Sequence, residues 1–390
     1  MFSSFAADVN ASAAPAAEQA SVHVVRGHQE VRALAGVLKE FGVRCGQPGA
    51  MQDLGFFLSK PGKMARMPHL LVVSQGKTFD AAKPKLEEWV GVLLIFEYQA
   101  MGRATGGFAT NDRSGRSTLV ALPGCEQRVV AMAVEALVKR RARVVMVSYR
   151  NESQVGGEAL RAMDAPPLQV AKGKKSAARW VTRERTIPGY LPLERTFDAT
   201  LAKIGQRTRS NLRYYRRRAE KQLGCRFLPE VEITRAELMA FNQECMYAVP
   251  AAVAGWRYES LKELSEPLLM GLKDGEGRWL SLLGGRRYGG RSEILWQMNV
   301  DGRAADSLST VMRSYFIEHE IARGSTRMYI EGGTPQPIRY SFVEERLIDL
   351  AVVRRSAVGQ MMSRLAKYYI SPDNDLANML EAAGLVWRDC

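Results

Sequence analysis

At 390 residues the chain exceeds the size at which one hydrophobic core usually stops growing, so we expect two domains. Its 55 Lys and Arg against 41 Asp and Glu give a formal charge of +14, which favours an anionic partner. A generally basic, solvated surface is the alternative explanation. Five scattered cysteines without CxxC spacing and four histidines without an HxxxH pattern argue against a disulfide framework and against a metal site.

The amino-terminal segment has the composition of a tail. Residues 1–21 are rich in Ala and Ser and lack the basic and apolar regions of a signal peptide, so we predict that they are disordered. No apolar run approaches the roughly 18 residues of a membrane span, and the most apolar one, Trp89–Phe96, has the length of a buried strand. Together with the reduced cysteines, these features predict a cytoplasmic protein.

The first half of the chain alternates predicted strands with predicted helices. Val22–Val25 is the first strand, and Gln29–Phe41 follows with apolar residues at the spacing of one helical face. The polar segment Asn151–Ala177 is typical of a linker. Further strands are predicted at Leu70–Ser74, Trp89–Tyr98, Gly106–Thr110, Ser117–Leu122 and Arg143–Tyr149, and a helix at Glu126–Arg141.

A strongly basic helix is predicted near the middle of the chain, within Thr196–Leu223. Between Lys203 and Lys221 there are eight Lys or Arg and one acid, Glu220, so this segment carries half of the formal net charge. Most of these cations are Arg, whose planar guanidinium suits phosphate better than the Lys ammonium does. The segment is either a phosphate-binding surface or a solvated face, and both interpretations remain open at this point.

The second half predicts a further set of strands and helices. Thr234 and Glu237 form a capping box before a helix that runs to about Ala248. Strands are predicted at Cys225–Ile233, Trp279–Arg287, Ser292–Val300, Arg327–Glu331 and Arg346–Val353, with a hairpin through Gly289-Gly290. Helices are predicted at Tyr258–Leu272, from Asp306 or Ser307 to Ala322, and in two segments at the end of the chain.

The two halves share one order of elements. Leu70–Tyr149 and Trp279–Glu331 each pass from strand to strand, through a polar Gly-containing turn, into a helix and then a short apolar strand. Residue identity between them is low, so chance similarity of common α/β elements is the alternative. The shared order predicts two versions of one structural unit.

The basic stretch FDATLAKIGQRTRSNLRYYRRRAEK resembles a segment of the CelD-like and FemAB-like acyltransferases, which consist of tandem GNAT domains. The later SEILWQMN, the helix that follows it and RMYIEGG resemble the sheet, helix and Gly-ended strand of the same family. The resemblance implies an α/β (α+β) fold with two tandem GNAT-like domains, residues 22–195 and 196–390. Each domain is expected to hold a mixed, mostly antiparallel sheet flanked by helices.

The resemblance also implies a reaction. Such an enzyme would transfer an acyl or aminoacyl group from a CoA-type donor, such as acetyl-CoA, or from a charged tRNA. The acceptor would be an amine or hydroxyl, including that of a cell-envelope or polysaccharide precursor. The chain departs from the usual GNAT phosphate loop, Q/R-x-x-G-x-G/A, because Asn299–Ser309 offers only Gly302 and Arg303. A helix N-terminus can still bind phosphate through its backbone N–H groups, so both donor classes stay open.

The residues that match the family pattern are the candidate site, and the resemblance implies their roles. Glu331, at the end of a strand, would be the general base, and Tyr340 would protonate the leaving group. Gln297, Asn299 and Arg303 would line the acyl cleft. The residues expected to bind phosphate of the donor or acceptor are Arg207, Arg209, Asn211, Arg213 and Arg217. No metal is expected.

Each candidate has a purely structural alternative. Glu331 could be a surface acid, and Tyr340 a packed aromatic side chain. The alternative for the whole chain is a non-enzymatic nucleic-acid-binding or scaffolding protein that uses the basic helix 203–221. This alternative predicts that the affinity for nucleic acid falls steeply with salt concentration and that binding does not require Glu331.

Overall fold

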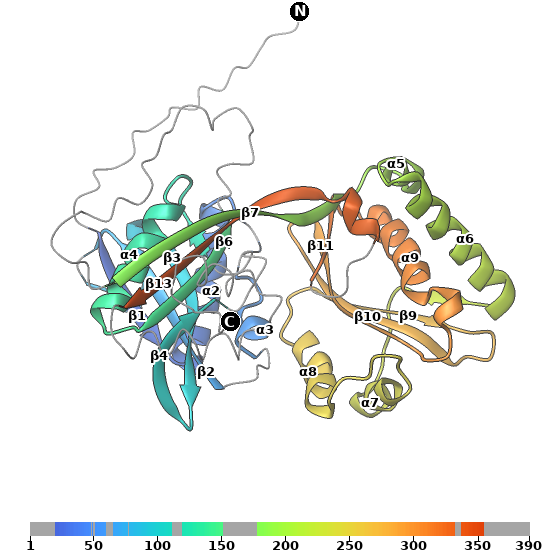
Figure 1. Ribbon diagram of the computed structural model, residues 1–390, viewed down its shortest axis with the longest axis horizontal. Helices are drawn as coiled ribbons and strands as arrows, with labels where there is room; N and C mark the ends of the chain where they lie inside the picture. Colours follow the sequence, from blue (N-terminus) through green and yellow to red (C-terminus); the bar gives the residue numbers. More distant parts are fainter. Residues whose placement is uncertain are drawn as a thin grey trace, which may run out of the picture.

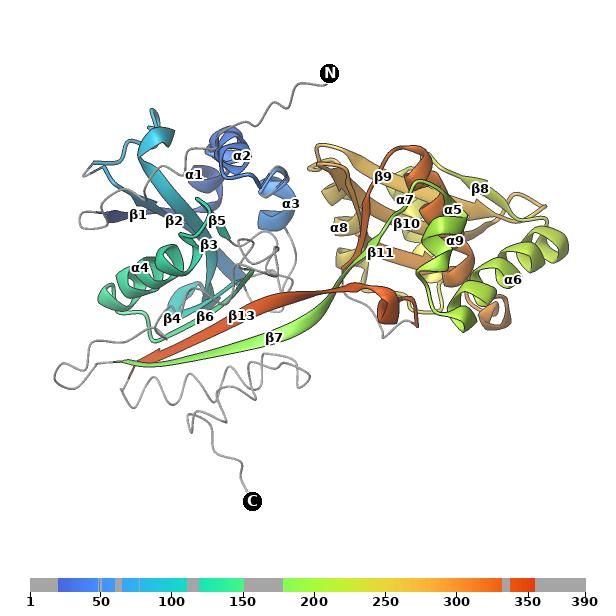
Figure 2. The ribbon, with the colours of Figure 1, turned by 90° about the horizontal axis from the view of Figure 1, so that it is seen from above.

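The computed structural model describes residues 20–47, 49, 51–59, 65–76, 78–110, 119–150, 178–331 and 337–354. The described residues form two lobes joined by a pair of long strands, as Figures 1 and 2 show. The predicted linker 151–177, the predicted closing helices and all but the last two residues of the predicted tail lie outside this part of the chain. None of the described helices is both long and apolar enough to cross a membrane.

The first lobe is a sheet covered by helices on both faces. Trp89–Phe96 is buried along its whole length, since one face of the sheet packs on α4 and the other on α1–α3. Its strands are β1 (Ser21–Arg26), β2 (Ala65–Ser74), β3 (Trp89–Ala100), β4 (Arg103–Ala109), β5 (Leu119–Ala121) and β6 (Val144–Arg150). Its helices are α1 (His28–Ala33), α2 (Ala35–Arg44), α3 (Leu54–Ser59), η1 (Leu86–Glu88) and α4 (Glu126–Lys139).

The second lobe has the same layered construction. Helices α5, α6 and α9 pack on one face of its sheet, and α7 and α8 pack on the other (Figure 1). Its strands are β8 (Arg226–Leu228), β9 (Pro267–Lys273), β10 (Trp279–Tyr288), β11 (Arg291–Asn299) and β12 (Arg327–Ile330). Its helices are α5 (Phe197–Ala202), α6 (Gln206–Leu223), α7 (Arg235–Gln243), α8 (Ala251–Leu261), η4 (Ala304–Asp306), α9 (Leu308–Ala322) and η5 (Pro337–Ser341).

The predicted repeat is confirmed by the strand pairing. In the first lobe, β2, β3 and β4 form an antiparallel meander, and after α4 the chain returns in β6, parallel to β4. In the second lobe, β9, β10 and β11 form the same meander, and after α9 the chain returns in β12, parallel to β11. An α/β fold of two mixed, mostly antiparallel units flanked by helices therefore agrees with the expectation from sequence.

Two long strands are exchanged between the lobes. β7 (Ala178–Pro192) follows the first unit, yet its end pairs with β12 of the second, through Leu191 and Met328. β13 (Val343–Arg354) follows the second unit, yet it pairs with β6 of the first, from Leu347 to Val353. The two strands also pair with each other, so the sheet order runs β4-β6-β13-β7-β12-β11 across both lobes (Figure 2). The domain boundary expected between residues 195 and 196 stays a prediction.

Three local predictions are wrong. The helix expected to run from the capping box at Thr234 to about Ala248 ends at Gln243. The helix expected at Tyr258–Leu272 ends at Leu261, and Pro267–Lys273 is the strand β9. Proline cannot continue a helix, and the apolar residues after it are buried between β8 and β10. The strand expected at Cys225–Ile233 is confined to β8, Arg226–Leu228, because Pro229 follows directly.

Candidate active site

The parallel strands β11 and β12 separate midway along β11. Within the described residues their pairing covers only Arg291–Ile294 and Arg327–Ile330, and it is followed by a bond from Glu331 N to Ile294 O of 2.8 Å. β11 itself continues to Asn299. A gap therefore opens beside the second half of β11, at the ends of both strands.

A β-bulge lies where the pairing of β11 with β12 ends. Gly285 pairs with Ile294 and Gly284 with Trp296, so Leu295 is an extra residue in β11. A bulge bends its strand and increases the local twist, and this one lies directly after Ile294, the last residue of β11 that pairs with β12. The glycines are needed here, because a Cβ on Gly285 would lie 2.2 Å from the carbonyl oxygen of Glu293.

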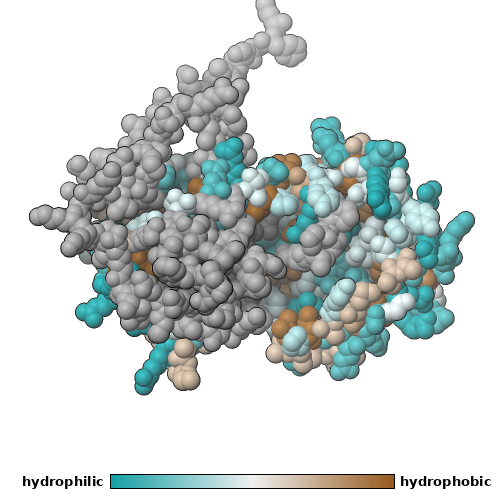
Figure 3. Space-filling view, in the orientation of Figure 1, coloured by the Kyte–Doolittle hydropathy of each residue, from teal (hydrophilic) through white to brown (hydrophobic). Residues whose placement is uncertain are grey.

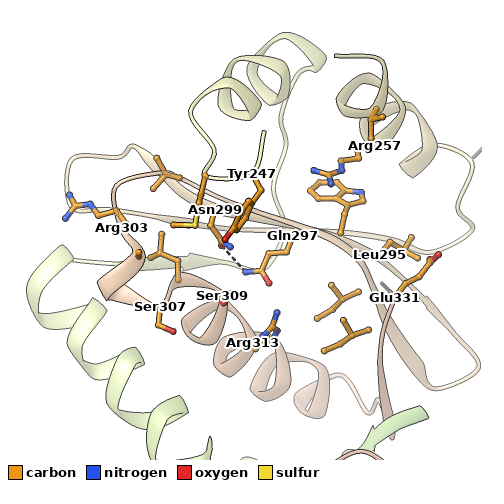
Figure 4. A pocket seen from close by; sticks show the side chains of 18 of the residues that line it. Tyr247, Arg257, Leu295, Gln297, Asn299, Arg303, Ser307, Ser309, Arg313 and Glu331 are labelled. Atoms are coloured by element: carbon orange, nitrogen blue, oxygen red, sulfur yellow. Dashed lines mark hydrogen bonds between the residues drawn. The ribbon is translucent and has the colours of Figure 1, made fainter. Parts of the chain in front are cut away.

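A cavity of about 690 Å³ occupies this gap and extends to both faces of the sheet. Its volume is typical of a site for a small-molecule ligand or cofactor. In Figure 4, Ser309 and Arg313 of α9 lie on one side of the strands, and Tyr247 and Arg257 on the other. Phe56 of the first lobe also lines it, packed on Trp256 at 5.4 Å between ring centroids.

Four of the predicted site residues line this cavity: Gln297, Asn299, Arg303 and Glu331. Gln297 Nε2 donates to Asn299 Oδ1 at 3.1 Å, as the dashed line in Figure 4 shows, and to the Ser281 hydroxyl at 3.3 Å. Gln297 Oε1 is buried without a hydrogen-bond partner in the structure. The strand end thus presents both a fixed amide network and an unused acceptor to the cavity.

The other predicted residues lie elsewhere. Tyr340 is in η5 and is 90% exposed, and it is not among the residues that line the cavity. The five residues expected to bind phosphate lie on α6, outside this cavity, where the surface is largely hydrophilic (right of Figure 3). Arg213 pairs with Asp198 at 2.6 Å, whereas Arg207 and Arg217 are exposed. The catalytic and phosphate-binding roles expected for these residues stay predictions.

One arginine of the basic helix does reach the start of α9. Arg218 Nη1 donates to the carbonyl of Ala305 at 3.3 Å, and its Nη2 lies 3.4 Å from Asp306 Oδ1. Ser307 follows in the left-handed conformation, with φ 50°, a position that glycine usually takes. The first N–H groups of a helix have no intrahelical acceptor, so the start of α9 can bind an anionic group at the cavity wall.

The sequence prediction missed Arg313, which points into the cavity in Figure 4. Its side chain is only 6% exposed, and its Nε has no hydrogen-bond partner in the structure. Burial, with a further contribution from the charge of Arg339, lowers the pKa of Arg313 to about 10. One feature of the sequence could have identified Arg313. It is the only charged residue in Leu308–Ile317, where the other residues are apolar or carry a hydroxyl group.

In the described part of the chain, no three His, Cys, Asp or Glu side chains lie close enough together to bind a metal ion.

No known family model and no curated protein sequence matches the chain. Among solved structures, it is similar to L-PGS from Bacillus licheniformis, with a TM-score of 0.46 and 10% identity over 85% of this chain and 95% of that one. It is similar to FemX, with a TM-score of 0.43 and 12% identity over 74% and 88% of the two chains. It is also similar to a tandem GNAT protein from the clavulanic acid pathway, with a TM-score of 0.43 and 10% identity over 86% and 99%. These similarities concern the fold alone.

Proposed function

We propose that the protein is an acyltransferase whose donor carbonyl sits in the gap between β11 and β12. The observation that carries this proposal is the divergence of the two strands at Leu295, beside the carboxylate of Glu331. Past the last ladder bond, β11 offers backbone N–H groups without a strand partner in β12. Such fixed donors can stabilise the negative charge that develops on a carbonyl oxygen during acyl transfer.

The chemistry assigned to this gap is attack of an amine or hydroxyl on the donor carbonyl. Glu331 takes the proton from the acceptor, directly or through a water molecule, as the new bond to the carbonyl carbon forms. The tetrahedral intermediate then collapses, the bond to the donor breaks, and the leaving atom takes up the proton held by Glu331, directly or through a water molecule. The leaving atom is a thiolate if the donor is an acyl-CoA and a ribose oxygen if the donor is an aminoacyl-tRNA.

Both donors carry phosphate, and two parts of the protein could bind it. The start of α9, with Arg303, would hold a diphosphate close to the cavity. The exposed arginines of α6, Arg207 and Arg217, would hold the backbone of a longer ligand such as tRNA. The acceptor class that fits is an amine or hydroxyl of a cell-envelope or polysaccharide precursor.

Equilibrium binding of acetyl-CoA, longer acyl-CoAs and a charged tRNA to the whole chain tests this proposal. Ser309→Phe fills the cavity beside Arg313 and should weaken binding of the true donor by more than tenfold. Ala236→Phe, on an exposed position of α7, is the matched control and should have no effect. A further variant, in which Arg207, Arg209 and Arg217 are all changed to Gln, should weaken the binding of tRNA but not of acyl-CoA.

The outcomes separate the classes of function. Failure of every donor to bind would overturn the acyltransferase proposal. Strongly salt-dependent binding of uncharged RNA and DNA alike, unaffected by Ser309→Phe, would favour the non-enzymatic nucleic-acid binder instead.

A further inference from the structure

Two arginines of the second lobe are almost completely buried, and they differ in their partners. Arg286, 2% exposed, forms ion pairs with Asp53 at 3.0 Å and with Glu293 at 2.7 Å. Arg313, 6% exposed, forms no ion pair with any described carboxylate. Among the described residues, the same side chain is therefore neutralised at one position and has no ion-pair partner at the other.

The charge of Arg313 is retained despite this cost. Burial lowers its pKa only to about 10, so the guanidinium stays protonated at neutral pH. A buried charge without a partner is unfavourable for folding, and a strongly perturbed titratable group in a cleft is a candidate for a functional site. Arg313 lies on the wall of the cavity, so a ligand in the cavity can reach it.

Two other polar atoms of the cavity wall also lack partners. Trp296 Nε1 and Gln297 Oε1 are buried at the cavity wall, and neither makes a hydrogen bond in the structure. Ile294, Leu308 and Ile330 form an apolar part of the wall.

Two further arginines line the cavity, but Arg303 lies 3.8 Å from the carboxylate of Asp306, and Arg257 lies over the Trp296 ring at 5.7 Å, on the side of the strands away from Arg313. The Arg313 charge, with neutral polar atoms and apolar side chains on the same wall, matches a singly charged, partly apolar group better than a dianionic phosphate.

We propose that Arg313 binds a carboxylate of the substrate inside the cavity. The inference rests on the proposed function to the extent that this carboxylate belongs either to the transferred acyl group or to the acceptor. The guanidinium of Arg313 pairs with the carboxylate, and the neighbouring apolar residues contact the carbon chain that bears it. The start of α9 remains the place for phosphate.

The first test is the thermal stability of the ligand-free protein. Arg313→Met removes an unpaired buried charge and should leave the melting temperature unchanged or raise it. Arg286→Met, the matched control, removes a paired one and should lower it by many degrees. A loss of stability in Arg313→Met as large as that in Arg286→Met would overturn the inference, because it would show that Arg313 is neutralised within the fold.

The second test is equilibrium binding of paired probes to the whole chain. Glutarate is compared with its diamide glutaramide, and succinyl-CoA with butyryl-CoA, so that the first pair differs in two carboxylates and the second in one. The wild type should prefer the carboxylate of at least one pair by about 10- to 100-fold. Arg313→Met should abolish this preference, Arg313→Lys should retain part of it, and Arg235→Met, an exposed arginine of α7, should retain all of it.

The pattern of preference identifies the source of the carboxylate. A preference within the CoA pair places it on the acyl group, and a preference for glutarate alone places it on the acceptor. No preference in the wild type, or a preference that persists in Arg313→Met, would overturn the inference. If no acyl-CoA or charged tRNA binds while glutarate still binds through Arg313, the acyltransferase proposal fails and the carboxylate site stands.

Discussion

Arg286 Nη1 lies 3.0 Å from Asp53 Oδ2, and this buried ion pair joins the sheet of the second lobe to the segment before α3 of the first. Asp53 is 1% exposed and also accepts a hydrogen bond from the backbone of Ser265 at 2.7 Å. Burial alone would lower the pKa of Arg286, but the charges of Glu293 and Asp53 raise it above its usual value. The pair holds α3, and with it Phe56, against the candidate cavity.

Removing one member of this pair should be costly. Asp53→Ala leaves the guanidinium of Arg286 with only one of its two carboxylate partners. Breaking a buried pair in this way costs about 3–5 kcal/mol. Urea unfolding measures the loss. Arg32 and Glu263 also join the lobes, at 3.4 Å, but both are well exposed, so Arg32→Gln should cost less than about 1 kcal/mol. Equal losses in the two variants would contradict the role given to Asp53.

The bulge in β11 depends on the absence of a side chain at Gly285. In Gly285→Ala the new Cβ would lie 2.2 Å from a backbone oxygen, so the strands must shift, and we expect a loss of about 1–3 kcal/mol with weaker donor binding. Gly36→Ala is the control. Its Cβ would meet nothing within 4 Å, at an exposed position of α2, so the variant should gain up to about 1 kcal/mol of stability. Unchanged stability and binding in Gly285→Ala would argue against the bulge.

Glu331→Gln should remove catalysis while keeping the donor bound. The amide has nearly the same shape as the carboxylate but cannot accept the acceptor's proton, and loss of a general base typically lowers the rate by about 10²- to 10⁴-fold. The measurement is single-turnover acyl transfer together with the donor dissociation constant. Glu344→Gln, at an exposed position of β13, should match the wild type. A normal rate in Glu331→Gln would remove this residue from the mechanism.

His69 should make the first lobe sensitive to acid. It is 6% exposed, and burial, followed by the charges of Arg26 and Arg140, lowers its pKa to about 4. Glu97 Oε2 lies 3.3 Å away and favours the protonated ring, but His69 Nε2 makes no hydrogen bond and burial dominates. The unfolded chain, with a pKa of about 6.5, therefore binds the proton first as the pH falls.

The stability contributed by the neutral ring is thus complete above pH 6.5 and is lost as the pH falls toward 4, by up to about 3 kcal/mol. His69→Gln should flatten the fall of unfolding free energy across this window, measured by urea titration at each pH. His28→Gln, on an exposed residue, should leave the slope unchanged. A slope that survives in His69→Gln would assign the acid sensitivity to other groups.

The exchanged strands predict that the lobes cannot be separated by a cut between Arg150 and Ala178. The first fragment alone leaves one edge of β6 unpaired, and exposed edges aggregate. Co-expression with the second fragment should give a soluble complex, seen by co-purification and sedimentation. A second fragment that ends at Phe342, before β13, should rescue the first poorly. A soluble, monomeric first fragment would contradict the structural importance of the exchange.

The sequence predicted those features that neighbouring residues determine. The hairpin through Gly289-Gly290 and the capping box of Thr234 and Glu237 are both present. The exchange of β7 and β13 could not be predicted, because an alternating apolar strand such as Arg346–Val353 does not specify which distant partner it will pair with. The helix expected at Tyr258–Leu272 failed because short apolar runs fit both a helix and a buried strand.

Only part of the candidate site was predicted from the sequence. Family resemblance pointed to Gln297 and Glu331, and the structure brings both to one cavity. Arg313 was missed because its importance comes from what surrounds it. Nothing in its helix reveals that its buried guanidinium lacks a carboxylate partner, which depends on side chains from other elements.

The pairing of β6 with β13 has a consequence for synthesis on the ribosome. Arg150 and its partner Leu347 are 197 positions apart (347 − 150), so at about 5–20 residues per second roughly 10–40 s pass between their translation. During that interval the nascent first lobe has its meander and α4 but keeps an open edge of Val-rich strand. The growing chain therefore exposes an edge of the kind that promotes aggregation until nearly the whole sequence has been made.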